Sequence, residues 1–82
     1  MIAKENKQIH DISTKKRVGK AITHRRKELQ LDISELSNFS GVSSSIISNI
    51  ENGKSNATIN TLEKILDILG LELNVDIKQV RG

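Results

Sequence analysis

The side chains best suited to chemistry lie in residues 41–53, GVSSSIISNIENG, where isoleucines at helical spacing are mixed with serine and asparagine. Serine is a mediocre helix former because its hydroxyl competes for backbone hydrogen bonds, so its abundance here needs another reason. At about 100° per residue, Ile46, Ile47 and Ile50 share one arc of a helix and are predicted to hold it against the core. The opposite arc is short, uncharged and able to donate and accept hydrogen bonds, and it contains Ser44, Ser45, Ser48, Asn49 and Asn52.

This hydroxyl and amide arc has the properties that a helix in a DNA major groove requires. Serine can bond to several base edges, and asparagine can pair bidentately with adenine. A weakly selected solvent face with a serine cap is the ordinary alternative for such a segment in isolation. The surroundings favour the groove, because a short helix and a Ser-Gly turn precede this helix and two longer amphipathic segments flank the pair, which is the helix-turn-helix arrangement.

Capping residues and apolar spacing predict four helices around this arc. The first begins at a cap at Ser13 or Thr14, and the second begins at a capping box made by Asp32 and Glu35. Ser43 caps the third. The four predicted helices cover residues 14–29, 33–39, 44–52 and 58–69, and glycines at 41, 53 and 70 follow the last three.

The same spacing predicts which side chains of these helices pack inward. They are Val18, Ala21, Ile22, Arg25 and Leu29 in the first helix, Leu36 and Phe39 in the second, and Ile59, Leu62, Ile65, Leu66 and Leu69 in the fourth. The opposite face of the first helix is basic. Lys16 and Arg17 on that face are candidates for phosphate contacts, although solvation alone would explain them.

Beyond residue 70 the apolar period changes to two, which is the pattern of a half-buried strand. Its alternating apolar residues are Leu71, Leu73, Val75 and Ile77. The rest of the chain predicts no second strand, and an isolated strand leaves its backbone groups unpaired. A second copy pairing antiparallel about Val75 would oppose Glu72 with Lys78 and bury a shared core in a symmetric dimer. A frayed tail, or addition to the sheet edge of another protein, is the alternative.

Composition excludes several classes of protein. The 82 residues contain no cysteine, so no disulfide can stabilise this small domain, and two histidines cannot form a metal cluster. His10 and His24 have no nearby nucleophile or paired carboxylates, so we expect neither an enzyme nor a cofactor. No segment approaches the roughly 18 consecutive apolar residues of a membrane span, and the first ten residues lack the apolar core of a signal peptide, which predicts a cytoplasmic protein. With the expected DNA binding it would be nucleoid-associated.

Charge is distributed unevenly along the chain. Residues 1–31 carry nine basic and three acidic side chains, whereas the remainder carries four basic and seven acidic ones. This concentration of positive charge is expected of a protein that binds a polyanion, although a solvated helix face gives the same pattern.

Residues 18–71 resemble the Xre/Cro-type helix-turn-helix family of phage repressors through GKAITHRRKELQLDISEL, the turn SGV and SSIISNIENGK. The resemblance implies a mainly α, lambda-repressor-like helix-turn-helix domain of four to five helices. The ending of the chain is also similar to that of HipB-type antitoxins, in which a C-terminal strand pairs across a dimer. We therefore expect a flexible tail at residues 1–12, a DNA-binding domain at residues 13–70 and a dimerisation strand at residues 71–82.

The resemblance also implies roles for individual residues. An ion pair between Arg26 and Glu51 would clamp the first and third helices together. Ile33 departs from the family, which usually has a glutamine there that binds phosphate, and an isoleucine cannot make this bond. The implied base-reading positions are Ser44, Ser45 and Asn49 with Ser48 beside them, and the implied phosphate contacts are Ser43, Asn52 and Lys54.

Two functions of different classes follow. The first is a dimeric repressor of a palindromic operator, as the antitoxin of a HipBA-like type II toxin–antitoxin module that autoregulates its operon and binds a HipA-like kinase toxin, or as a stand-alone phage-type repressor. The second is a protein-interaction module that uses its C-terminal strand to extend the sheet of a partner, for which Ile33 is the best support.

Overall fold

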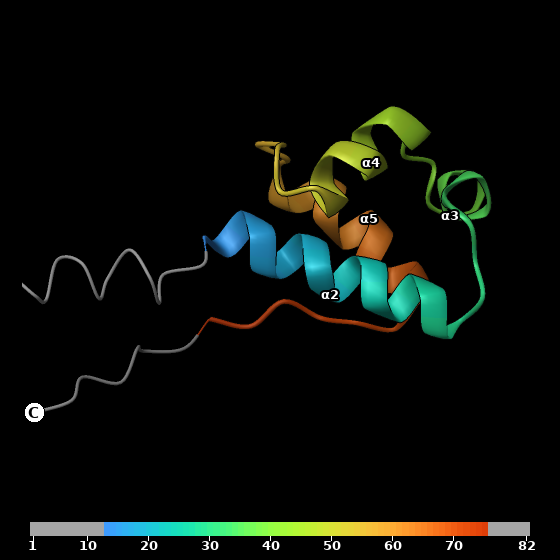
Figure 1. The fold of residues 1–82 in the computed structure, drawn as a ribbon, viewed down its shortest axis with the longest axis horizontal. Helices are drawn as coiled ribbons and strands as arrows, with labels where there is room; N and C mark the ends of the chain where they lie inside the picture. The colour runs from blue at the N-terminus through green and yellow to red at the C-terminus, as the bar shows by residue number, and fades with distance from the viewer. Residues whose placement is uncertain (1–12, 76–82) are drawn as a thin grey trace, which may run out of the picture.

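A computed structural model describes residues 13–75, and four helices make up most of this range. They are α2 (Thr14–Glu28), α3 (Ile33–Ser40), α4 (Ser44–Glu51) and α5 (Ile59–Leu69), drawn in Figure 1. The mainly helical prediction is confirmed, and the predicted helices agree with the observed bounds to within one residue. The predicted tail at residues 1–12 and the predicted strand residue Ile77 lie outside the described residues.

Local side-chain caps explain where the helices begin. The Ser13 hydroxyl accepts a hydrogen bond from the Lys16 backbone N–H at 3.3 Å, and the Thr58 hydroxyl accepts one from the Thr61 N–H at 3.1 Å. The Asp32 carboxylate accepts from the Glu35 backbone N–H at 2.7 Å, and the Glu35 carboxylate accepts from the Asp32 N–H at 3.0 Å. These caps satisfy backbone N–H groups that have no partner within the helix.

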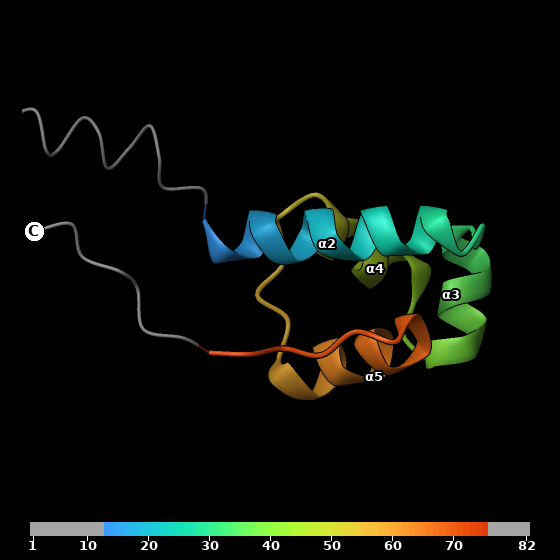
Figure 2. The same ribbon diagram turned by 90° about the horizontal axis from the view of Figure 1, so that it is seen from below.

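The core lies where the four helices meet. Figure 2 shows α2 and α5 lying along one another, with α3 across one end of the pair, and α4 packs against both α2 and α3. Arg25 links α2 to the end of α5 by donating from Nε to the Leu69 carbonyl oxygen at 2.9 Å. The buried apolar side chains come from every helix and from the turn before α4, and they are Ile22, Leu36, Val42, Ile47, Ile50, Ile65, Leu66 and Leu69.

Several predicted inward positions are wrong, and most of them lie at helix ends. Phe39 is 60% exposed in the last turn of α3, and Ile59 is 66% exposed at the first residue of α5. Ile46, in the first turn of α4, is 42% exposed, and Leu29, which follows α2, is 38% exposed. The chain enters or leaves the core at these points, so the helical spacing of apolar residues predicts more burial of these side chains than the structure shows. Ala21 is exposed as well, because α2 turns a different residue, the buried Gly19, toward α4.

The segment after α5 continues along the molecule without forming a strand within the described residues. Leu71 packs against the core, whereas Leu73 is 43% exposed and Val75 is 94% exposed. A strand requires a hydrogen-bonding neighbour, so pairing between copies stays a prediction. Within residues 13–75, none of the helices is both long and apolar enough to cross a membrane.

Candidate nucleic-acid interface

The outward arc of α4 presents hydroxyl and amide groups to solvent. Ser44, Ser45 and Asn49 are exposed, and Ser48 is partly buried beside them. Asn52 is also exposed, and its Nδ2 donates to the Ser48 carbonyl oxygen at 2.9 Å, which orients the amide at the end of the helix. The arc therefore offers several hydrogen-bond donors and acceptors, and none of its own side chains is charged.

The start of α4 is held by Ser43, one of the implied phosphate contacts. Its hydroxyl accepts a hydrogen bond from the Ile46 backbone N–H at 3.2 Å, while the side chain remains exposed. Because a hydroxyl has one proton to donate as well as two lone pairs, this cap leaves the proton available to a phosphate oxygen.

An ion pair joins the last turn of α2 to the end of α4. Arg26 Nε lies 2.7 Å from Glu51 Oε2, Arg26 Nη2 lies 3.0 Å from Glu51 Oε1, and the two side chains are only 11% and 7% exposed. Arg26 also donates from Nη1 to the Leu31 carbonyl oxygen at 2.8 Å. The hydrogen bond to Glu51 raises the pKa of Arg26, and burial opposes this rise. The bidentate geometry fixes the orientation of α4 relative to α2.

The same contact depends on Gly19, which sequence analysis missed. A Cβ atom built on Gly19 would lie 2.7 Å from the Glu51 carbonyl oxygen and closer still to that of Ile50. The backbones of α2 and α4 therefore meet with no room for a side chain. A glycine inside a helical pattern is the sequence signal for such close packing, because glycine is otherwise unfavourable in a helix.

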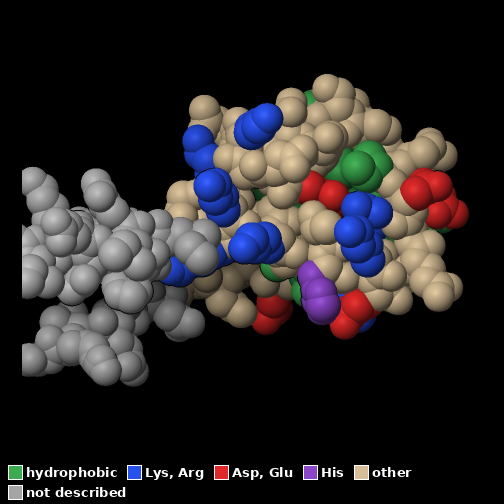
Figure 3. Space-filling view, in the orientation of Figure 1, with side chains coloured by type: hydrophobic (Ala, Val, Ile, Leu, Met, Phe, Trp, Pro, Cys, Tyr) green, Lys and Arg blue, Asp and Glu red, His purple; other side chains and the backbone are tan. Residues whose placement is uncertain are grey.

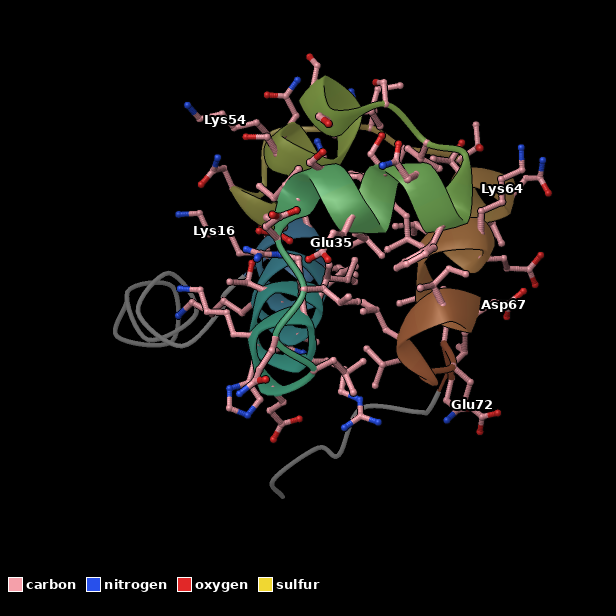
Figure 4. All side chains as sticks on the ribbon, turned by 90° about the vertical axis from the view of Figure 1, so that its right-hand side faces the viewer. Lys16, Glu35, Lys54, Lys64, Asp67 and Glu72 are labelled. Carbon is pink, nitrogen blue, oxygen red and sulfur yellow. The ribbon has the colours of Figure 1, made fainter. Side chains whose placement is uncertain are left out.

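Two lysines from different elements lie together at the end of α4. Gly53 has a positive φ of 71°, and a Cβ atom there would lie 2.8 Å from Lys16 Cγ, so the Lys16 stem packs across this turn. Figure 4 shows Lys16 and Lys54 extending from the same side of the molecule, while Lys64, Asp67 and Glu72 lie on the opposite side. The fold thus pairs a lysine of α2 with the lysine that follows α4.

Basic side chains continue along α2 beside a shallow polar groove. The groove runs between α2 and the end of α4. Figure 3 shows lysine and arginine side chains gathered on this face. Arg17 is exposed on α2, and two further exposed lysines of this helix, Lys20 and Lys27, line the groove. Its lining residues are Lys20, Thr23, His24, Arg26, Lys27, Glu51 and Asn52.

The first residue of α3 has a structural role. Ile33 is partly buried and packs against the core, which accounts for an apolar residue there. Asp32 and Glu35 occupy the start of the same helix through their reciprocal hydrogen bonds. Across residues 13–75, no group of three or more histidine and acidic side chains could hold a metal ion.

A short helix, a tight turn and a second helix with an exposed hydrogen-bonding face define a helix-turn-helix module. A family model described as "Helix-turn-helix" matches residues 22–75. The "ImmF control region 10 kDa protein" of Bacillus phage phi105 is 37% identical over 60 residues, which make up 73% of this chain and 67% of that protein. The chain belongs to the helix-turn-helix family and is a DNA-binding regulator of the Xre type.

Two solved structures are similar over most of the chain. A HipB variant in complex with an O2 20mer is 28% identical, with a TM-score of 0.72, and the match covers 83% of this chain and 94% of that one. A HipA-HipB-O2-O3 complex contains a chain that is 29% identical, with a TM-score of 0.71, and the match covers 83% of this chain and 96% of that one. These matches agree with the resemblance to HipB-type proteins inferred from the sequence.

Proposed function

We propose that this chain is a dimeric repressor that binds a palindromic operator and serves as the antitoxin of a HipBA-like toxin–antitoxin module. The observation that carries the proposal is the exposed arc of Ser44, Ser45 and Asn49 on a helix whose orientation is fixed by the Arg26–Glu51 ion pair. In this role Asn49 and the serines read base edges. Ser43, Asn52, Lys54, Lys16 and Arg17 contact phosphates.

A dimer gives this small surface enough selectivity. One copy offers few base contacts, whereas two copies joined by their C-terminal segments present two such helices to half-sites about 34 Å apart. In our proposal residues 71–82 form the dimerisation strand. The side chains of Leu73 and Val75, which residues 13–75 leave 43% and 94% exposed, support this assignment.

The kinase-toxin partner is supported by the similarity to HipB, which occurs with HipA in the HipA-HipB-O2-O3 complex. The phage phi105 relative supports the alternative of a stand-alone phage-type repressor. The genes next to this one distinguish the two. Co-expression with an adjacent kinase-like gene should relieve that gene's growth inhibition if the chain is an antitoxin, and a repressor without a toxin has no such neighbour.

The DNA-binding role is tested by salt dependence. Lys16, Arg17 and Lys54 give three cationic phosphate contacts per copy, so a dimer should lose about 10³-fold in duplex affinity between about 50 and 200 mM salt. Fluorescence anisotropy with a duplex enriched from a random pool measures this loss. An affinity that does not change with salt would contradict the proposed phosphate contacts.

Two substitutions separate base reading from phosphate binding. Asn49→Ala should relax sequence preference by about 1–3 kcal/mol at one base pair, whereas Lys54→Ala should weaken enriched and random duplexes alike. Equal effects of both changes on both duplexes would refute this division.

The protein-interaction alternative is tested by removing residues 71–82. The proposed repressor should then become monomeric and bind DNA more weakly. A truncated chain that keeps its DNA affinity but loses a protein partner would favour the alternative.

A further inference from the structure

Ile46 is an apolar side chain on the helix that carries the hydroxyl and amide arc. It is 42% exposed, whereas the neighbouring Ile47 and Ile50 are buried. Among the described residues, the core and the apolar side chains packed against it do not include Ile46. Packing among residues 13–75 therefore gives no reason for an isoleucine at this position.

The position of Ile46 borders the groups proposed to read bases. Residues three apart on a helix are neighbours on its surface, with Cβ atoms about 5–6 Å apart, so Ile46 lies next to Asn49. Ser45 precedes it and is also exposed. The Ile46 backbone N–H is bonded to the Ser43 hydroxyl at 3.2 Å, and a β-branched side chain has a restricted χ1 angle in a helix. Ile46 is thus a rigid apolar contact at the edge of a polar arc.

Major-groove chemistry supplies one matching apolar group. Thymine presents a C5-methyl group there, and the adenine that asparagine reads is paired with thymine. We propose that Ile46 determines specificity by packing against a thymine methyl group beside the base pair read by Asn49. The proposal rests on the DNA-binding function proposed above and adds a base preference to it.

Replacement of thymine by uracil tests this contact, because uracil lacks the methyl group but keeps the same hydrogen-bonding groups. The full chain first enriches a duplex from a random pool, and each thymine of that duplex is then replaced singly by uracil. One position in each half-site should show an affinity loss of about fourfold, the value expected for removing one methyl group from an apolar contact. The same loss should disappear in the Ile46→Ala variant.

Phe39→Ala is the matched control, because Phe39 is an exposed apolar residue that lies on α3 instead of α4. It should leave the uracil profile unchanged. Circular dichroism melting should show that Ile46→Ala remains folded, as expected for a side chain outside the core.

Three results would overturn the inference and leave the proposed function intact: uracil tolerated at every position, a uracil penalty that persists in Ile46→Ala, or an enriched half-site without thymine. DNA affinity and sequence preference that are unchanged in Ile46→Ala would likewise overturn the inference. Failure of the native chain to enrich any duplex would overturn the proposed function and the inference together.

Discussion

The contact between α2 and α4 is complete within one chain, whereas the surface formed by α5 and residues 71–75 is not. The first is closed by the ion pair between Arg26 and Glu51 and by backbones that meet at Gly19. The second leaves Ile59 66% exposed and Val75 94% exposed. The ion pair thus orients α4, the proposed DNA-reading helix, and exposed apolar side chains remain on α5 and residues 71–75, where a second copy is proposed to bind. Stability and assembly should therefore respond to substitutions in different regions.

The largest effect on stability is expected at the contact between α2 and α4. Arg26→Ala would leave the largely buried Glu51 carboxylate without its partner and should reduce the free energy of unfolding by about 3–5 kcal/mol. Because the pKa of Arg26 is raised, its contribution is present at every pH below the ordinary pKa of arginine, and is lost only as the pH rises through the folded-state value. The loss should therefore be the same between about pH 6 and 9. Urea unfolding at one protein concentration measures it.

The control for this experiment replaces both partners, as Arg26→Met with Glu51→Leu. The double variant should be more stable than Arg26→Ala, because no unpaired charge remains buried. Equal losses in the two variants would mean that the ion pair does not account for the effect.

On the surface formed by α5 and residues 71–75, a substitution should change dimer formation without changing the stability of the single chain. Val75→Asp should raise the dimer dissociation constant about 100-fold, because two valine side chains, each worth about 1.5 kcal/mol, would no longer be buried and two carboxylates would face each other. Analytical ultracentrifugation measures the change. Asn60→Asp, which adds the same charge at an exposed position on α5, should have little effect. An unchanged dissociation constant in Val75→Asp would refute pairing about this residue.

These two regions also show which parts of the fold the sequence predicts. Helix bounds depend on local signals such as the Asp32–Glu35 capping box and the Ser43 cap, so they were predicted to within one residue. Burial at helix ends depends on where the chain goes next, which a period of about 3.6 residues does not encode. Phe39 and Ile46 were assigned inward for that reason.

In the candidate site, too, the sequence predicts some features, whereas others depend on how distant segments pack. The residue types of the α4 arc were visible in the sequence, and their roles in binding DNA stay predictions. The close approach at Gly19 could not be predicted from periodicity, because it depends on how two distant helices pack. For the same reason the sequence did not indicate that the Lys16 stem packs across Gly53 beside Lys54.

A smaller loss of stability at the contact between α2 and α4 is expected when Gly19 is replaced. Alanine is favoured over glycine in a helix by about 1 kcal/mol, but a methyl group here would meet backbone carbonyls that cannot move aside. Overpacking typically costs about 1–3 kcal/mol, so Gly19→Ala should lower the free energy of unfolding by about 2 kcal/mol. The reverse change at an exposed position of the same helix, Ala21→Gly, should lower it by about 1 kcal/mol. Thermal unfolding that finds Gly19→Ala stabilised would contradict the close approach.

The smallest effect is at the N-caps of α4 and α5, which each accept one backbone N–H bond but differ in the surface they face; the Thr58 hydroxyl also donates to the Thr61 hydroxyl at 3.0 Å. Ser43 accepts from the Ile46 N–H at 3.2 Å and Thr58 accepts from the Thr61 N–H at 3.1 Å. Alanine at either position should therefore reduce the free energy of unfolding by about 1 kcal/mol. Only the Ser43 hydroxyl adjoins the proposed DNA-reading arc, so only Ser43→Ala should also weaken duplex binding. Anisotropy measured well below the melting temperature separates the two effects, and equal weakening by Thr58→Ala would show that cap stability, and not a phosphate contact, governs affinity.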